Sequence, residues 1–276
     1  MRVLPERTFP MRLLVFATAS ASLWAQAPNV HGPKIDELLK KSGAANDANG
    51  PKARQYLYRE YTVTTELDGK GEPSSRHTET WEAIGLEGSE YRRLVQRDDK
   101  PLTAKEQKQE DEKLRKETDR RRKEKKGGIK NPLSRTYSFG YSAGDERFFD
   151  FRYVGEEVVD ERPMYVLEGT PKSGVKPTND HEKQLLLSHL KLWIDKEEFF
   201  GSGFEMNVTG AGGDMRPGTM IAIKQQRMED GTWLMNDLRF KLIIKPLGIV
   251  NVRKEGVITR SGFHKFVVDS RILELQ

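Results

Sequence analysis

Alternating hydrophobic and polar residues run through most of this chain in short segments. Leu238, Phe240 and Leu242 occupy one side of a segment near the C-terminus. Arg239 and Lys241 occupy the other side. A period of two residues predicts a strand with one buried face and one face in water.

Similar segments recur at regular spacing, separated by turns that contain Gly or Asp. The expected strands are Gln55–Leu67, Arg76–Leu86, Ser89–Arg97, Arg135–Tyr141, Phe148–Val159, Met164–Thr170, Lys191–Asp195, Phe204–Thr209, Thr219–Met228, Thr232–Ile244, Gly248–Thr259 and Phe263–Ile272. This spacing predicts a mainly β fold with an antiparallel sandwich or barrel, and it argues against alternating βαβ units.

One amphipathic helix is expected ahead of the strands. Ile35, Leu38 and Leu39 fall at the i, i+3, i+4 spacing of one helix face. Gly43 is a stop signal, and residues 44–51 are expected to form a loop. A helix this short is not stable alone, so it must dock on an apolar surface.

A second helical segment, residues 103–126, is charged along its whole length. Thr103 and Glu106 fit a capping box, and Leu114 is the only large apolar residue inside. The pattern predicts a solvated helical arm, inserted at 103–128, without a buried face. An electrostatic contact with anionic lipid or nucleic acid is the functional alternative. Interspersed acids cancel most of the field that such a contact needs.

The net charge of +5 depends largely on that arm. It holds eleven Lys or Arg and seven Asp or Glu, whereas the whole chain has 47 and 42. The excess positive charge therefore does not describe a general nucleic-acid surface. Four Trp, eight Tyr and twelve Phe exclude a wholly disordered chain. The absence of Cys excludes disulfides, thiolate catalysis, Cys-bound zinc and lipid attachment at an N-terminal Cys.

The N-terminal residues fit a secretory signal. A basic start precedes the apolar run Leu13–Trp24, and a small-x-small site ends at Ala27. This pattern predicts a cleavable signal peptide, residues 1–27, on an exported protein that is not lipidated. Translation could start at Met1 or at Met11.

Motifs of reactive chemistry are missing. The histidines show no i, i+4 pair, although His181 and His189 lie eight residues apart in a segment that fits either helix or strand. The Gly-rich stretch around Ser202 lacks the Lys of a phosphate cradle, and no nucleophile elbow occurs. We therefore expect no metal, no cofactor and no enzymatic activity. A hydrolase built from scattered residues is the enzymatic alternative.

Three strand segments resemble a known family. Phe151–Pro171, read as FRYVGEEVVDERPMYVLEGTP, is similar to the central hairpin of bacterial outer-membrane lipoprotein-sorting proteins, the LolA/LolB-like superfamily. Lys191–Asp195, read as KLWID, looks like the next strand, and Trp233–Ile244 looks like a later one.

The resemblance implies a single domain, residues 28–276, in the periplasm. Its fold would be a strongly curved antiparallel sheet, an open half-barrel whose apolar hollow is covered by helices and receives acyl chains. The expected lid residues are Ile35, Leu38 and Leu39. The expected lining residues are Tyr56, Tyr58, Trp81, Phe204, Met206, Trp233 and Met235.

Two functions from different classes follow. The first is a non-enzymatic carrier or sensor that holds lipid or a lipoprotein's acyl chains in the hollow. The second is an envelope interaction protein whose sheet is filled by its own side chains and whose charged arm makes the contacts. In either case an envelope protein partner is conceivable, nucleic acid is not expected, and 103–126 could touch an anionic membrane surface.

Overall fold

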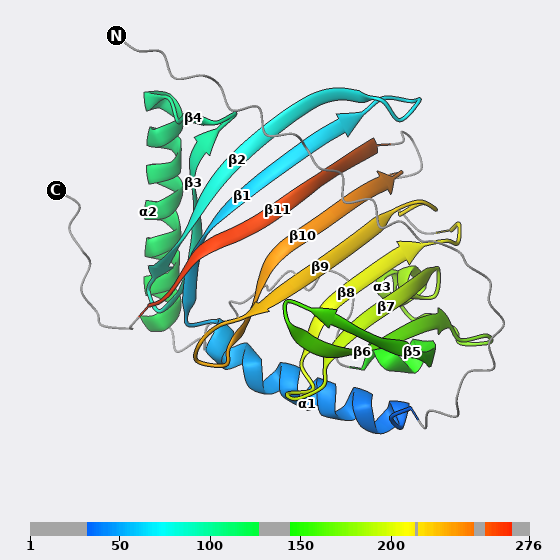
Figure 1. Cartoon of the computed structure of the whole chain (residues 1–276). Helices are drawn as coiled ribbons and strands as arrows, with labels where there is room; N and C mark the ends of the chain where they lie inside the picture. The colour runs from blue at the N-terminus through cyan, green and yellow to red at the C-terminus, as the bar shows by residue number, and fades with distance from the viewer. Residues whose placement is uncertain (1–31, 127–143, 213–214, 246–251, 267–276) are drawn as a thin grey trace, which may run out of the picture. The chain divides into compact units, whose positions relative to one another are not determined.

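The computed structural model describes residues 32–126, 144–212, 215–245 and 252–266. The predicted signal peptide and the predicted strand Arg135–Tyr141 lie outside these residues. The described part of the chain contains three α-helices, one short 3-10 helix and a large sheet (Figure 1).

Every strand of the described residues belongs to one antiparallel sheet. The strands are β1 (Tyr56–Leu67), β2 (Pro73–Leu86), β3 (Ser89–Arg97), β4 (Lys100–Pro101), β5 (Phe149–Val159), β6 (Arg162–Pro171), β7 (Ser188–Asp195), β8 (Gly201–Val208), β9 (Met220–Arg227), β10 (Trp233–Ile244) and β11 (Val252–Lys265). Their order is β4-β3-β2-β1-β11-β10-β9-β8-β7-β6-β5. The two outer strands do not pair with each other, so the sheet is open. The predicted mainly β fold with an unclosed antiparallel sheet is confirmed.

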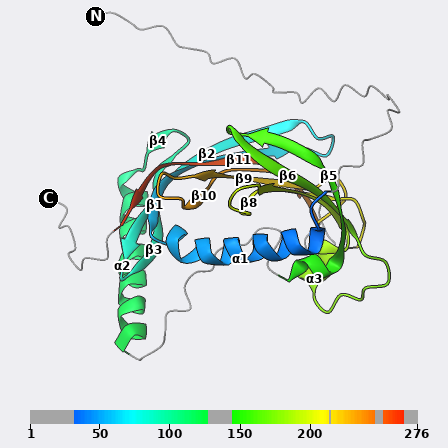
Figure 2. The same ribbon diagram turned by 60° about the horizontal axis from the view of Figure 1, so that its bottom comes forward.

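The helices lie on one side and at the ends of this sheet. Figure 2 shows the sheet arching over α1 (Ile35–Ala53), and we call the face toward α1 the concave face. Helix α2 (Ala104–Lys126) contacts β3, near one end of the strand order. Helix α3 (Asp180–Leu185) and the 3-10 helix η1 (Asp145–Phe148) contact each other at the other end.

The alternation predicted on β10 sets the register of the central strands. Leu238 lies opposite Ile223 of β9 and Ile258 of β11, and its side chain is buried. One row below, Phe240 lies opposite Gly256. A Cβ on Gly256 would collide with the Val63 carbonyl oxygen and stand 2.7 Å from the Phe240 ring, so glycine is required at this close approach.

The structure corrects the C-terminal strand prediction. The segments Gly248–Thr259 and Phe263–Ile272 were expected to form separate strands, but β11 continues through the proposed turn. Gly262 has φ +63°, a left-handed conformation that glycine adopts freely, and the pairing of β11 with β1 shifts register nearby. The ambiguous segment His181–Leu190 contains all of α3 except its first residue and the start of β7.

Helix α1 is longer than predicted. It has 19 residues, runs through Gly43, and contains Pro51 in its final turns. A glycine costs a helix about 1 kcal/mol relative to alanine, which tertiary contacts readily outweigh. Here such contacts lie on both sides of Gly43, at the buried Ser42 before it and at Asn46 and Asn49 after it, where the sheet backbone is bound.

Helix α2 has a buried face made of charged residues, contrary to the expected solvated arm. Arg121 is 6% exposed and donates to the backbone carbonyls of Leu86 (2.9 Å), Ser89 (3.2 Å) and Glu90 (3.0 Å). Glu117 accepts from Arg121 at 2.6 Å. Because these groups are polar, the hydrophobic pattern carried no sign of the contact.

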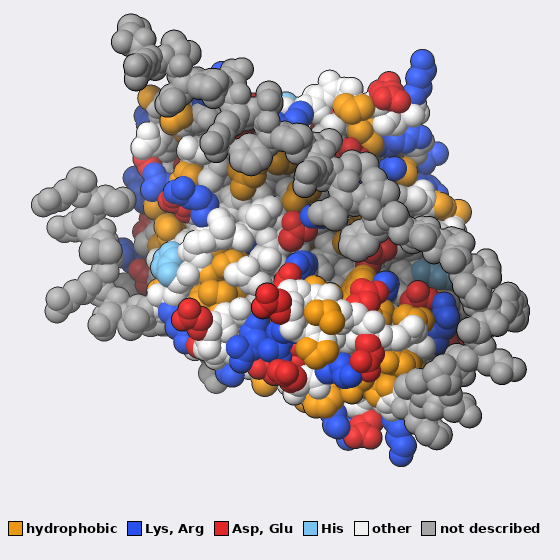
Figure 3. Space-filling model, in the orientation of Figure 1, with side chains coloured by type: hydrophobic (Ala, Val, Ile, Leu, Met, Phe, Trp, Pro, Cys, Tyr) orange, Lys and Arg blue, Asp and Glu red, His pale blue; other side chains and the backbone are white. Residues whose placement is uncertain are grey.

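The basic run of α2 is largely neutralised by neighbouring acids. Arg120 forms ion pairs with Glu117 (2.6 Å) and Glu124 (2.5 Å), and Arg122 pairs with Glu87 (2.7 Å). Figure 3 shows acidic and basic side chains interspersed over one face of the molecule as well. A single-sign patch of the kind that attracts nucleic acid is not visible on that face.

We expect Arg121→Met to lower the free energy of unfolding by about 2 kcal/mol, because it leaves three backbone carbonyls without their charged donor and removes one of the two arginines that donate to Glu117. Urea denaturation measures this change. Lys123→Met, an exposed position on the same helix, is the control and should change stability little. Equal effects of the two substitutions would mean that α2 does not dock through Arg121.

The attachment of α2 should also weaken in acid. Hydrogen bonds from Arg120 and Arg121 lower the pKa of Glu117 from its ordinary 4.5 to about 2. Its contribution to stability is therefore present above pH 4.5 and lost as the pH falls toward 2. The difference in unfolding free energy between the natural protein and Glu117→Gln, measured across this range, should shrink as the pH falls. A constant difference would contradict the assignment.

Candidate functional site

Residues that lie directly opposite each other in antiparallel strands point to the same face of the sheet, and this assigns the concave face. One cross-strand row consists of Leu192, Phe204, Ile223, Leu238, Ile258 and Thr62. Leu192 packs in one cluster with Leu38 of α1. The row therefore lies on the concave face.

By the same register, all seven predicted lining residues lie on the concave face. Trp81 is opposite Glu60, and Tyr58 and Tyr56 precede Glu60 at steps of two along β1. Met206 follows Phe204 by two residues on β8, and Met235 is opposite Gln225 of β9. Trp233 precedes Met235 by two residues on β10. The structure does not gather the seven into one pocket, and they fall into three separate groups.

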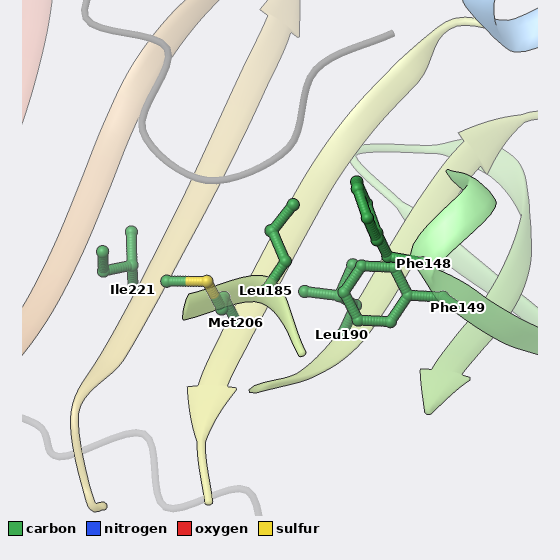
Figure 4. Close-up of a cluster of buried hydrophobic side chains, with 6 residues drawn as sticks. All are labelled: Phe148, Phe149, Leu185, Leu190, Met206 and Ile221. Carbon is green, nitrogen blue, oxygen red and sulfur yellow. The ribbon is translucent and has the colours of Figure 1, made fainter. Parts of the chain in front are cut away.

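Phe204 and Met206 belong to the packed core. Met206 is buried in a cluster with five other side chains, which Figure 4 shows converging from η1, β5, α3, β7 and β9. Its members are Phe148, Phe149, Leu185, Leu190, Met206 and Ile221. Phe204 packs partly buried against this cluster and against that of Leu38. At this end the hollow is filled by the protein's own side chains.

Trp233 anchors the structure near the other end of α1. Its ring stacks on Phe200 with centroids 5.0 Å apart, and its indole nitrogen donates to Glu198 at 2.7 Å. Met235 is half-buried on the same strand. Tyr56 is buried beneath Lys265, and burial raises the pKa of its hydroxyl.

The predicted lid residues are packed against the sheet. Leu38 is 2% exposed among Leu167, Leu192 and Ile194. Ile35 and Leu39 pack partly buried on the same cluster. In this structure the first turns of α1 therefore close that part of the concave face.

The second half of α1 is held by side-chain amides that bind strand backbone. Asn49 donates to the Trp233 carbonyl at 2.9 Å and accepts from the Trp233 amide at 2.8 Å. Asn46 accepts from the Gly201 amide at 3.1 Å. The helix thus joins β8 and β10 across the concave face, and this fastening was missed because Asn carries no hydrophobic signal.

Between the packed core and β1, the concave face carries a partly open row of apolar side chains. This apolar strip consists of Ile223, Leu238, Phe240, Leu242 and Ile258. Leu238 is buried, whereas the other four are only partly buried. The strip continues from the cluster of Met206, against which three of its members pack.

Next to the apolar strip lies a charged cluster that the sequence analysis missed. Glu60 is 1% exposed, and it accepts from Arg260 at 2.9 Å and from Arg92. Arg260 lies over the ring of Tyr58 (4.2 Å to the centroid), and Arg92 lies over Trp81 (5.0 Å). The available sequence signal for this cluster was Glu60 itself, an acid at an inward-facing strand position between Tyr58 and Tyr61.

The turn after β7 has a structural role. Asp195 is fully buried and accepts from Arg162 (2.6 and 2.9 Å) and from the backbone amides of Glu197 and Glu198. Burial raises the pKa of Asp195, but the Arg162 and amide hydrogen bonds outweigh it and lower the pKa overall. The turn positions Phe200 so that its ring stacks on the ring of Trp233.

A cavity of about 330 Å³ opens beside this turn, lined in part by Arg162, Arg227 and Trp233. Its two arginines are already paired, Arg162 with Asp195 and Arg227 with Glu198 at 2.8 Å. Of the predicted lining residues, Trp233 alone borders it. The cavity therefore does not coincide with the expected acyl-chain hollow.

Within the described ranges, no group of three or more His, Asp or Glu side chains could hold a metal ion. His181 approaches Asp145 at 3.3 Å. No helix in the same part of the chain combines the length and apolar character needed to cross a membrane.

No protein-family model and no curated protein matches the chain. Solved structures do. A DUF1329 family protein from Desulfovibrio piger is 15% identical, with 86% of this chain and 95% of that chain covered and a TM-score of 0.38. An outer membrane lipoprotein-sorting protein domain from Vibrio parahaemolyticus is 9% identical, with 85% and 94% covered and a TM-score of 0.37.

A LolA superfamily protein from Nitrosomonas europaea is 10% identical, with 85% of this chain and 94% of that chain covered and a TM-score of 0.33. The family to which the hairpin Phe151–Pro171 was likened is thus named among these solved structures. Because their TM-scores are 0.38 or less, these likenesses carry no argument about function, which must come from the residues of this chain.

We expect Asn49→Ala to loosen α1, because both hydrogen bonds to Trp233 are lost. The free energy of unfolding should fall by about 2 kcal/mol, and the amides of α1 should exchange hydrogen faster. Asp47→Ala, an exposed neighbour on the same helix, is the matched control. Unchanged exchange in Asn49→Ala would show that the hydrogen bonds of Asn49 do not hold the helix.

Proposed function

We propose that this protein is a non-enzymatic periplasmic carrier or sensor that binds lipid or lipoprotein acyl chains on the apolar strip. The observation that carries the proposal is a row of partly exposed apolar side chains on the concave face of an unclosed sheet, with a helix across it. Such apolar concavities are the usual binding places for apolar ligands.

Acyl-chain binding on this strip needs no reactive group. Each methylene removed from water contributes about 0.8 kcal/mol, so a long chain gains affinity from burial alone. The strip offers side chains from β9, β10 and β11, which together form a continuous apolar surface. Because the packed core fills the β5–β8 side, a chain would lie on the strip and not on Phe204 or Met206.

Helix α1 is the element that would regulate access. Ile35, Leu38 and Leu39 close the β6–β7 part of the concave face, and Asn49 ties the other half of α1 to β10. Release of the polar fastening costs less than removal of the apolar turns, because its hydrogen bonds are exchanged for bonds to water. We infer that α1 opens from its C-terminal half.

The proposed location follows from the predicted signal peptide, residues 1–27, with no lipid anchor on the mature chain. The partner would be the lipid or lipoprotein itself, together with an envelope protein that receives it. Nucleic acid is not proposed, because the excess charge sits on α2, where Arg120 and Arg122 are paired with acids.

An envelope interaction protein is the second candidate. It is favoured by the filled cluster of Met206 and by the length of α2, whose Arg121 side docks while the opposite side stays exposed. In that case the sheet would be a platform and α2 the contact surface, including any contact of 103–126 with anionic membrane.

We expect Ile258→Asn to weaken the binding of a fluorescent fatty-acid probe at least severalfold, because it places an amide in the apolar strip. Mass spectrometry of lipid extracted from the gently purified mature protein should show the same loss. Val257→Asn is the matched control, since Val257 is the next residue and points to the convex face.

If the natural protein carries no lipid and ignores the probe, carrier function is rejected and the interaction protein is favoured. Equal effects of Ile258→Asn and Val257→Asn would reject the apolar strip as the binding surface. Circular dichroism of both variants establishes that each is folded before binding is compared.

A further inference from the structure

The charged cluster beside the apolar strip combines features of an oxyanion site. We propose that Arg92 and Arg260 bind the anionic head group, a phosphate or carboxylate, of an amphiphile whose chain lies on the strip. This inference rests on the proposed function and specifies the ligand as an acidic lipid.

The cluster stands directly at the end of the apolar strip. Arg260 follows Ile258 by two residues on β11, so both side chains leave the same face about 7 Å apart along the strand. Glu60 is opposite Arg260 on the neighbouring strand β1. A ligand lying along Ile258 would therefore bring its polar end to the guanidinium groups.

Both guanidinium groups retain donors beyond the bond to Glu60. Arg260 uses only Nε for Glu60, and its two terminal nitrogens have no hydrogen-bond partner among the described residues. In Arg92 one terminal nitrogen donates to Glu60, while Nε is buried and unpartnered within the described part of the chain. Because Nε of Arg92 has no exposed surface, the remaining terminal nitrogens of the two arginines are the donors that a bound oxyanion would use.

The surroundings suit a charged head group that is only partly desolvated. The Arg260 side chain is 24% exposed and that of Arg92 is 36% exposed, so both can be reached from outside. The rings of Tyr58 and Trp81 lie under the guanidinium planes and hold them in place. Arginine then offers a planar fork that matches phosphate and carboxylate oxygens.

Glu60 sets the strength of this site. One carboxylate faces two arginines, so the three groups together carry a single positive charge. The nearby Glu90 accepts from the Tyr58 hydroxyl at 2.7 Å and lowers the local potential further. This balance favours binding that can be reversed, as a carrier or sensor requires.

The test compares oleoyl-lysophosphatidic acid with monooleoylglycerol, which share the acyl chain and differ in the phosphate. Calorimetry on the mature protein should show roughly tenfold tighter binding of the phosphate compound, as charge-assisted hydrogen bonds provide. Arg260→Gln should abolish that preference while monooleoylglycerol binding stays unchanged. Arg239→Gln, an exposed arginine on the convex face, is the control.

Glu60→Gln is the independent variant, because a binding role and a purely structural role predict different effects on the preference for the phosphate compound. It removes the competing negative charge and should widen the preference for the phosphate compound severalfold. A purely structural cluster would lose stability in Glu60→Gln with no change in preference, and that result would overturn the inference.

The remaining outcomes separate the two proposals. Equal binding of both lipids, unaffected by Arg260→Gln, would overturn the head-group site and leave acyl-chain binding intact. Binding of neither lipid would overturn the proposed function. Glycerophosphate without a chain is the third ligand, and if it bound as tightly as the lipid, the site would be one for free phosphate and the amphiphile would be rejected.

Discussion

The open sheet sets the central constraint on this protein, because one face of eleven strands must be covered by very little helix. Clusters around Met206 and Leu38 cover the β5–β8 part of the concave face with α3, η1 and the first turns of α1. On β9–β11 four side chains of the apolar strip, those other than the buried Leu238, are only partly buried. One half of the concave face is therefore packed by side chains and helices, and the other half is only partly covered. Any ligand-binding role depends on this difference.

The second half of the concave face is organised by charge, which changes the character of the hollow. Where a wholly apolar lining would accept any chain, Glu60 with Arg92 and Arg260 marks one end of the apolar strip as polar. An amphiphile has the same two-part composition. In the proposed function, this arrangement would select both the class of ligand and its orientation.

The strand pattern was largely predictable from sequence, since alternation in β10 and the turn residues around it express local rules. Phe204 and Met206 were predicted to line a hollow and lie on the concave face, but the pattern could not tell packed core from open surface, which depends on the helices above. Gly43 misled the prediction for α1 because Asn46 and Asn49 compensate for it through distant strands. Glu60 and Arg121 were missed for a related reason, because a buried charge is recognised only once its partner is placed.

The way Asn49 grips β10 has a consequence for how variation is distributed between the two elements. The Asn49 side chain binds the backbone amide and carbonyl of residue 233 and not its side chain. A substitution at position 233 would therefore keep both hydrogen bonds. The helix has no such latitude, because few side chains offer a donor and an acceptor on one short arm. As far as these two hydrogen bonds are concerned, position 233 of the strand therefore tolerates substitution, whereas position 49 of the helix does not.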